Sequence, residues 1–297
     1  MELIFEIKDN KFYNVKEIIK SHFQISDRLL TKLKKEKRIF LNNKPVYVTE
    51  QVQAGDLLKL DMNFVEDSDN ILPVKMDLDI VYEDDYLLIV NKPPFLPVHP
   101  SCYHYDNSLS NGIKYYFNSI NLKRKIRPIN RLDKDTSGLV IFAKHEYIQE
   151  ALVKQMKAQL FKKEYIAILT GNLEKSFGTI NAPIARKAGS IMEREISESG
   201  ETAISHFELI KNLDNFCVVK YTLETGRTHQ LRVHSKYISH PILGDTLYGE
   251  ESTLIDRQAL HAYKISFIHP ITQKELILET ELPNDIKQLL CNMKEKL

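Results

Sequence analysis

The chain has 297 residues, a length that predicts two domains. Hydrophobic residues make up 43% of it and charged residues 27%, which is typical of a globular protein. The formal net charge is +1, so the chain as a whole has no electrostatic excess that would favour nucleic acid.

Signals for export, disulfides and membranes are missing from the sequence. The three cysteines, Cys102, Cys217 and Cys291, are far apart and odd in number, which disfavours a disulfide framework and indicates a reducing compartment. The first residues show no signal-peptide pattern. No apolar run approaches the roughly 20 residues that a membrane-spanning helix needs. We therefore expect a cytoplasmic protein without a membrane partner, and a monomer because no apolar surface helix stands out.

The N-terminal part, residues 1–65, is predicted to be a small module with a basic edge. Residues 1–60 carry 12 Lys and Arg against 8 Asp and Glu, a local net charge of +4. Two helices are expected, the second capped by Asp27. The stretch "RIFLNNKPVYV" predicts a hairpin around an Asn-Asn turn, and "AGDLLKLDM" predicts a last strand. Five cations gather after the apolar face of the second helix: Lys32, Lys34, Lys35, Lys37 and Arg38.

Residues 66–76 are polar and acidic and form the predicted linker to a larger domain, residues 77–297. Two strands are expected in "DIVYEDDYLLIVNK", helices in "NSLSNGIKYYFNSI" and "HEYIQEALVKQMKAQLF", and further strands in "LVIFA", "KKEYIAILTG" and "FCVVKYTLET". Ile148, Leu152 and Leu160 form the predicted apolar stripe of the second helix. Because strands and helices seldom alternate as βαβ units, we expect an α+β fold with a mixed sheet.

The stretch "NRLDKDTSGLVIFAK", residues 130–144, places a carboxylate at the edge of a sheet. "DTSG" is a turn signal, since short polar side chains bond their own backbone and glycine allows positive φ. "LVIFA" reads as a buried strand, so Asp133 lies on the loop that enters it, where functional residues are common. From composition alone, the favoured interpretation is that Asp133 and Asp135 only cap the turn.

A second polar stretch, "LETGRTHQLRVHSKYISHPILGD", predicts a helix over residues 229–239. Thr228 is the expected cap, and Pro241 ends the helix. Arg227 lies just outside the helix start, where a guanidinium and a helix N-terminus together favour an anion. The alternative is an ordinary capped helix with solvated cations. The histidines of this stretch do not share one helical face and no carboxylate joins them at ligand spacing, so we expect no metal site.

Taken together, "RLDKDTSGLVIFAK", "KKEYIAILTG" and "GRTHQLRVH", in that order, resemble the RluA/RluD-type family of pseudouridine synthases. "VYEDDYLLIVNKPPFLPVHP" and "SHPILGDTLYG" fit the same pattern. The resemblance runs from about residue 77 to the C-terminus. It implies a mixed, mainly antiparallel central sheet with flanking helices. Residues 1–65 resemble the ribosomal-protein-S-four-type RNA-binding domain that often precedes this catalytic domain.

The resemblance implies an enzyme that isomerises uridine in RNA to pseudouridine without a cofactor. It implies large-subunit ribosomal RNA as the substrate, with transfer RNA left open. Asp133 would be the catalytic aspartate and Arg227 its ion-pair partner. Tyr165 would stack on the target base, and its hydroxyl is a candidate general base. The implied substrate contacts are Arg131, Leu231 and Asn130, and in the N-terminal module the five clustered cations would contact RNA phosphates.

Two alternatives stay open at this point. The family usually has His before its RLD triplet, whereas this chain has Asn130, which cannot carry a charge. The first alternative is therefore a non-catalytic RNA-binding or ribosome-assembly factor. The second is a hydrolytic glycosidase or nuclease that uses Asp133 and Asp135, which requires both carboxylates in one pocket about 5–10 Å apart.

Overall fold

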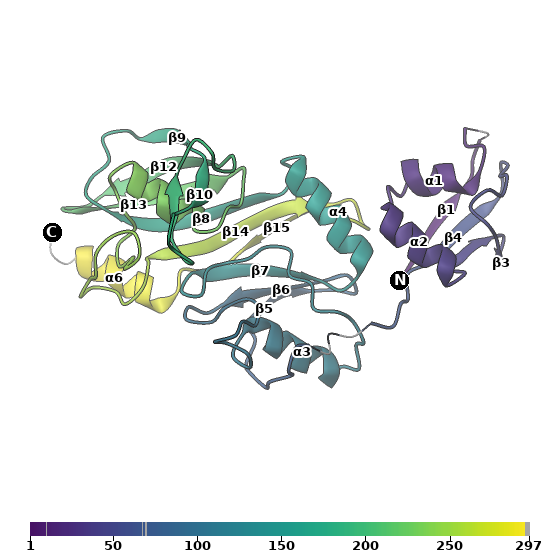
Figure 1. Cartoon of the computed structure of the whole chain (residues 1–297), viewed down its shortest axis with the longest axis horizontal. Helices are drawn as coiled ribbons and strands as arrows, with labels where there is room; N and C mark the ends of the chain where they lie inside the picture. The colour runs from purple at the N-terminus through teal and green to yellow at the C-terminus, as the bar shows by residue number, and fades with distance from the viewer. Residues whose placement is uncertain (10, 67, 69, 295–297) are drawn as a thin grey trace.

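The computed structural model describes residues 1–9, 11–66, 68 and 70–294, and Figure 1 shows an elongated molecule with the N-terminal unit at one end. Residues 67 and 69 of the predicted linker, and residues 295–297 of the predicted larger domain, lie outside the described residues. Within the described part, no helix is long and apolar enough to cross a membrane.

The N-terminal unit is a four-stranded sheet covered by two helices. The apolar face of the second helix, formed by Leu29, Leu30 and Leu33, is buried as predicted. Its cap is Ser26 and not Asp27, because the Ser26 hydroxyl accepts the backbone N–H of Leu29 at 3.1 Å. The elements are β1 (Glu2–Glu6), α1 (Val15–Ser21), α2 (Asp27–Lys35), β2 (Ile39–Leu41), β3 (Lys44–Pro45) and β4 (Leu57–Asp61).

The larger unit is built on a mixed, mainly antiparallel sheet, which confirms the predicted fold class. Its strand order is β5-β6-β7-β14-β8-β13-β12-β9, with β15 added beside β14. Among the described strands, only β7 and β14 pair in parallel. The strands are β5 (Ile80–Glu83), β6 (Leu87–Lys92), β7 (Ser137–Ala143), β8 (Lys162–Thr170), β9 (Phe177–Asn181), β12 (Ile204–Asn212), β13 (Phe216–Leu223), β14 (Leu260–Ile268) and β15 (Glu275–Glu279).

In the described part of the larger unit, four helices and a small hairpin flank this sheet. Helix α4 lies between the sheet and the N-terminal unit, and α6 lies at the opposite end of the molecule (Figure 1). The helix before β8 is shorter than predicted, and Leu160 lies beyond its end with 57% of its surface exposed, so its place in the apolar stripe was wrong. The helices are α3 (Leu109–Ser119), α4 (Glu146–Lys157), α5 (Gln230–Tyr237) and α6 (Asn284–Lys294), and the hairpin strands are β10 (Ile184–Arg186) and β11 (Arg194–Ile196).

Buried ion pairs join the N-terminal unit to the larger one. The carboxylate of Glu66 accepts hydrogen bonds from Lys32 of α2 at 2.8 Å and from Arg127 at 2.7 and 2.8 Å. Lys32 also lies 3.5 Å from Glu146 at the start of α4. The side chains of Glu66 and Arg127 are each only 8% exposed, so this contact is held with little competition from water.

Gly138 sets the close approach of β7 and β14. It has φ +119°, and a Cβ built on it would lie 2.2 Å from the carbonyl oxygen of Ala262. Residues with a side chain are strained at such φ values, and the backbone of Ala262 cannot move away without breaking the parallel pair. Glycine at residue 138 therefore allows β7, the strand that follows the Asp133 loop, to pair closely with β14.

We predict that Gly138→Ala lowers the free energy of unfolding by about 3 kcal/mol or more, because strain and a backbone clash act together. Gly189→Ala is the matched control, since Gly189 also has positive φ (+74°) but a Cβ added there would have nothing within 4 Å. The control is expected to lose only about 1–2 kcal/mol. Urea unfolding of both variants measures the difference, and equal losses would contradict the role given to the β7–β14 approach.

Candidate active site

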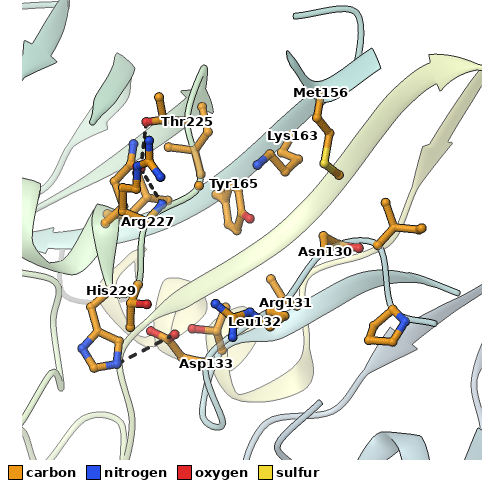
Figure 2. Close-up of a pocket in the computed structure, with 18 of the residues that line it drawn as sticks. Asn130, Arg131, Leu132, Asp133, Met156, Lys163, Tyr165, Thr225, Arg227 and His229 are labelled. Carbon is orange, nitrogen blue, oxygen red and sulfur yellow. Dashed lines mark hydrogen bonds and ion pairs between the residues drawn. The ribbon is translucent and has the colours of Figure 1, made fainter. Parts of the chain in front are cut away.

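A cavity of about 910 Å³ opens where the loop before β7, the first half of β8, the end of α4 and the start of α5 meet. Figure 2 shows Asp133, from the loop before β7, and Lys163 and Tyr165, from β8, on its walls. The apolar part of the lining includes Leu132, Leu223 and Leu231, and cationic side chains are spread around it. The cavity thus combines an apolar wall with positive charge.

Asp133 lies on the loop that enters β7, as predicted, and its side chain is 27% exposed. The loop is held from both sides. The backbone N–H of Thr136 donates to the carbonyl of Asp133 at 3.1 Å, and the fully buried ammonium of Lys92 donates to the carbonyl of Lys134 at 2.9 Å. Lys92 also binds the carbonyls of Pro93 and Leu96, so the Asp133 loop is tied to the loop after β6.

The ion-pair partner of Asp133 is Arg232. Its Nη1 lies 3.3 Å from Oδ2 of Asp133. Its Nε and Nη2 each donate to Asp245 at 2.7 Å, and Asp245 is fully buried. Burial opposes the charge on Arg232, but the hydrogen bonds and charges of Asp245 and Asp133 together raise its pKa. Arg232 therefore stays cationic between the two carboxylates.

The predicted partner, Arg227, does not contact Asp133, and that prediction was wrong. Its Nε donates to the carbonyl of Thr202 at 2.9 Å, and its Nη1 lies 2.7 Å from the carboxylate of Glu201. Figure 2 shows it beside Thr225, apart from Asp133. The reason is the local backbone, because the helix starts three residues after Arg227 and places the next arginine, Arg232, on the face toward the loop.

The start of α5 also differs from the prediction. Its N-cap residue is His229, in the left-handed conformation with φ 57°, and no side chain caps the helix, so Thr228 does not have the predicted role. The Nε2 of His229 lies 4.0 Å from Oδ1 of Asp133, and its Nδ1 lies 2.9 Å from the hydroxyl of Tyr248. Burial lowers the pKa of His229, although the charge of Asp133 opposes this effect. The ring is therefore neutral at neutral pH.

Tyr165 lies on β8 and is 6% exposed, with its ring directed into the cavity (Figure 2). Burial raises the pKa of its hydroxyl, and the charge of Asp133 adds to this effect. Within the described residues, the hydroxyl has no hydrogen-bond partner. The ring thus offers the cavity a flat apolar surface and a hydroxyl that keeps its proton.

The other predicted substrate contacts divide into two groups. Arg131 and Leu231 line the cavity as expected. Asn130 also lines it, but the two ends of its amide are used within the protein. The Nδ2 donates to the carbonyl of Leu139, and the Oδ1 accepts the N–H of Ile141, both at 2.9 Å. Asn130 therefore ties the Asp133 loop to β7, and the substrate contact predicted for it stays a prediction.

A second catalytic carboxylate is not found among the described residues around the cavity. Asp135 is not among the lining residues. Glu224 is, but its two carboxylate oxygens bind His206 at 2.6 Å and Gln159 at 3.0 Å. The hydrolase alternative therefore lacks the pair of facing carboxylates that it requires. In the described parts of the chain, no group of three or more His, Cys, Asp or Glu residues could hold a metal ion.

The five cations of the predicted basic cluster differ in their partners and exposure. Lys32 is paired with Glu66, and Arg38 is paired with Glu36 and Asp61 at 2.8 and 2.6 Å. The remaining three cations of the cluster, Lys34, Lys35 and Lys37, are exposed. Of the five, these three are available at the surface of the N-terminal unit.

The sequence of this chain matches known RNA pseudouridine synthases. Residues 86–237 match the model of the RNA pseudouridylate synthase family. The uncharacterized RNA pseudouridine synthase YjbO of Bacillus subtilis (strain 168) is 39% identical over 90% of this chain and 94% of its own. Ribosomal large subunit pseudouridine synthase D of Buchnera aphidicola subsp. Schizaphis graminum is 38% identical over 75% of this chain and 76% of its own.

A solved structure shares the fold. Human RNA pseudouridylate synthase domain containing 4 superposes with a TM-score of 0.60, at 22% identity, over 72% of this chain and 92% of that one. The family match spans Asp133, Tyr165 and Arg232 of the cavity described above. The chain belongs to the RNA pseudouridylate synthase family, in its RluA/RluD-type branch, and is an isomerase that converts uridine in RNA to pseudouridine.

Proposed function

We propose that this synthase modifies specific uridines of large-subunit ribosomal RNA, with Asp133 as its catalytic residue and without a cofactor. The ribosomal assignment rests on relatives named ribosomal large subunit pseudouridine synthase D, of which several are 32–38% identical to this chain. The observation that carries the catalytic role is the position of Asp133, in a cavity with an apolar wall and between the cationic Arg232 and the neutral ring of His229.

The reaction exchanges one bond of the nucleoside for another. The N1–C1′ bond breaks, the uracil turns, C5 bonds to C1′, and the proton on C5 leaves while N1 gains one. C1′ becomes electron-poor as the first bond breaks, so an ionised carboxylate can attack or stabilise it. Atoms and electrons balance within the nucleotide, and the proposal therefore needs no redox or group-transfer cofactor.

Arg232 holds the Asp133 carboxylate in one orientation, through a contact of 3.3 Å between its Nη1 and Oδ2 of Asp133. Because Asp245 already binds Nε and Nη2 of the guanidinium, Arg232 presents a fixed Nη1 to Asp133. The carboxylate thus reaches the anomeric carbon in one orientation.

Tyr165 gives the flipped uracil a surface to stack on. A base inside a duplex cannot reach a cavity of this kind, so it must leave its stack, and an aromatic ring replaces part of the lost stacking. The raised pKa of Tyr165 makes its hydroxyl a poor acceptor for the C5 proton in the free enzyme. We therefore assign the ring, and not a phenolate, to substrate binding.

The test of the proposed function uses Asp133→Asn with ribosomal RNA transcripts. Loss of the carboxylate should lower the single-turnover rate on the order of 10⁴-fold, a loss of the size seen when a catalytic carboxylate is removed. RNA affinity should change less than threefold, because the amide has nearly the same shape. Turnover at the wild-type rate would refute the assignment of Asp133.

Arg232→Lys keeps the positive charge but cannot bind Asp245 at two points and Asp133 at a third. Its rate of product formation should fall about 10- to 100-fold. Arg227→Lys is the matched control and should fall less than threefold, since Arg227 binds Glu201 and Thr202 instead. Thermal unfolding of both variants checks that each is folded. A larger loss in the Arg227 variant would restore the arrangement expected from the sequence.

We further propose that residues 1–65 form an RNA-binding domain that contacts phosphates through Lys34, Lys35 and Lys37. Replacing all three by Gln should reduce the slope of log affinity against log salt by about 2 to 3, since each phosphate contact contributes about 0.7–0.9. A triple Gln variant of the exposed Lys8, Lys11 and Lys16 removes the same charge from the same unit and should leave the slope nearly unchanged. Equal slopes in the two variants would contradict a specific contact surface.

A further inference from the structure

Lys163 is a cation of the active-site cavity to which the reaction described above gives no role. It lies two residues before Tyr165 on β8, so the two side chains project from the same face of the strand. Both line the cavity, and Figure 2 shows them side by side on its wall. The neighbouring Lys162 projects from the other face and is exposed to solvent.

The ammonium of Lys163 is partly buried and has no partner among the described residues. Burial lowers its pKa, and no carboxylate opposes that effect. Other buried cations of this chain are matched: Lys92 binds three backbone carbonyls, and Lys144 binds Glu83 and the carbonyl of Asp84. Lys163 is therefore a partly buried cation without a neighbouring anion or hydrogen-bond acceptor among the described residues.

The surroundings of Lys163 leave room for an anion. Its Nζ would lie 3.1 Å from a Cβ built on Gly226, so the absence of a side chain at that residue leaves the ammonium uncovered on that side. Lys157, from the end of α4, adds a second positive charge to the same cavity lining. Desolvating an unpaired cation costs free energy, and an incoming anion recovers it. In RNA the anionic groups at neutral pH are the phosphodiesters.

Lys163 is also set apart from the catalytic carboxylate. Figure 2 shows Lys163 on the side of Tyr165 that faces away from Asp133. A phosphate bound by Lys163 would therefore lie outside the immediate reach of Asp133. This separation suits two different parts of one nucleotide, the sugar at Asp133 and a neighbouring phosphate at Lys163.

We propose that Lys163 binds a phosphodiester directly flanking the target uridine and so fixes the flipped nucleotide at a second point. The proposal deepens the proposed function and rests on it, since the ligand is the RNA substrate itself. Lys163 is a binding residue in this account, and the chemical step belongs to Asp133.

The experiment uses an RNA hairpin containing a uridine that the wild-type enzyme isomerises. Three versions are compared: the natural hairpin, and hairpins with a neutral methylphosphonate on the 5′ or the 3′ side of that uridine. For Lys163→Met we expect KM to rise about tenfold, with kcat changed less than threefold, and the salt slope of binding to fall by about 0.7–0.9. One of the two methylphosphonates should weaken wild-type binding by a similar factor and leave the Lys163→Met variant unaffected.

Two further variants control for charge and fold. Lys162→Met removes the same charge from the opposite face of β8 and should behave as wild type. Lys163→Arg keeps the charge and should retain the salt slope. The proposal is overturned if Lys163→Met has the same KM and salt slope as Lys162→Met. It is also overturned if Lys163→Met binds the natural hairpin more weakly, yet each methylphosphonate weakens binding to this variant as much as binding to the wild type. Failure of the wild-type enzyme to modify any RNA would instead count against the proposed function.

Discussion

The active site depends on one guanidinium shared between two carboxylates. Arg232 is bound at two points by the fully buried Asp245, and its remaining nitrogen faces Asp133. Oδ1 of Asp245 also accepts the backbone N–H groups of Leu247 and Tyr248, so its own position is fixed. A buried ion pair of this kind adds little net free energy to folding, because desolvation of the charges offsets their attraction, but its hydrogen bonds fix the orientation of both side chains. Its consequence is that the Asp133 carboxylate, the proposed catalytic group, is oriented before RNA arrives.

The sheet supplies the other half of this arrangement. Asp133 approaches Arg232 because its loop is pinned by Lys92 on one side and by Asn130 on the other. The strand after the loop can lie close to β14 because residue 138 is glycine. The loop before β7 and the start of α5 are almost 100 residues apart in sequence, since Asp133 and Arg232 are separated by 99 positions. Sheet topology, and no local motif, brings them together.

The sequence predicted local structure better than it predicted partners. The turn and buried strand after Asp133, the strand carrying Tyr165 and the mixed sheet follow from turn residues, apolar runs and the family resemblance. The choice between Arg227 and Arg232 does not, because it depends on the left-handed backbone at His229, which sets where α5 begins. Asp245 could have been noticed in "SHPILGD", but nothing local marks it as the anchor of Arg232.

The partners of the N-terminal cations could not be predicted from the sequence for a related reason. Lys32 and Arg38 look like part of a single cluster in the sequence, yet Glu66 and Asp61 neutralise them from 34 and 23 residues away. Long-range counter-ions of this kind cannot be read from local charge. Asn130 shows the opposite case, since a residue that departs from the usual family histidine proves to be a hydrogen-bonded support for the Asp133 loop.

The most direct test of the account is a map of pseudouridine in total RNA from cells that lack this gene and carry back either the wild-type or the Asp133→Asn form. The account predicts that a discrete set of pseudouridines in large-subunit ribosomal RNA disappears, and that only the wild-type form restores them. Restoration of those sites by Asp133→Asn would contradict the central role of Asp133.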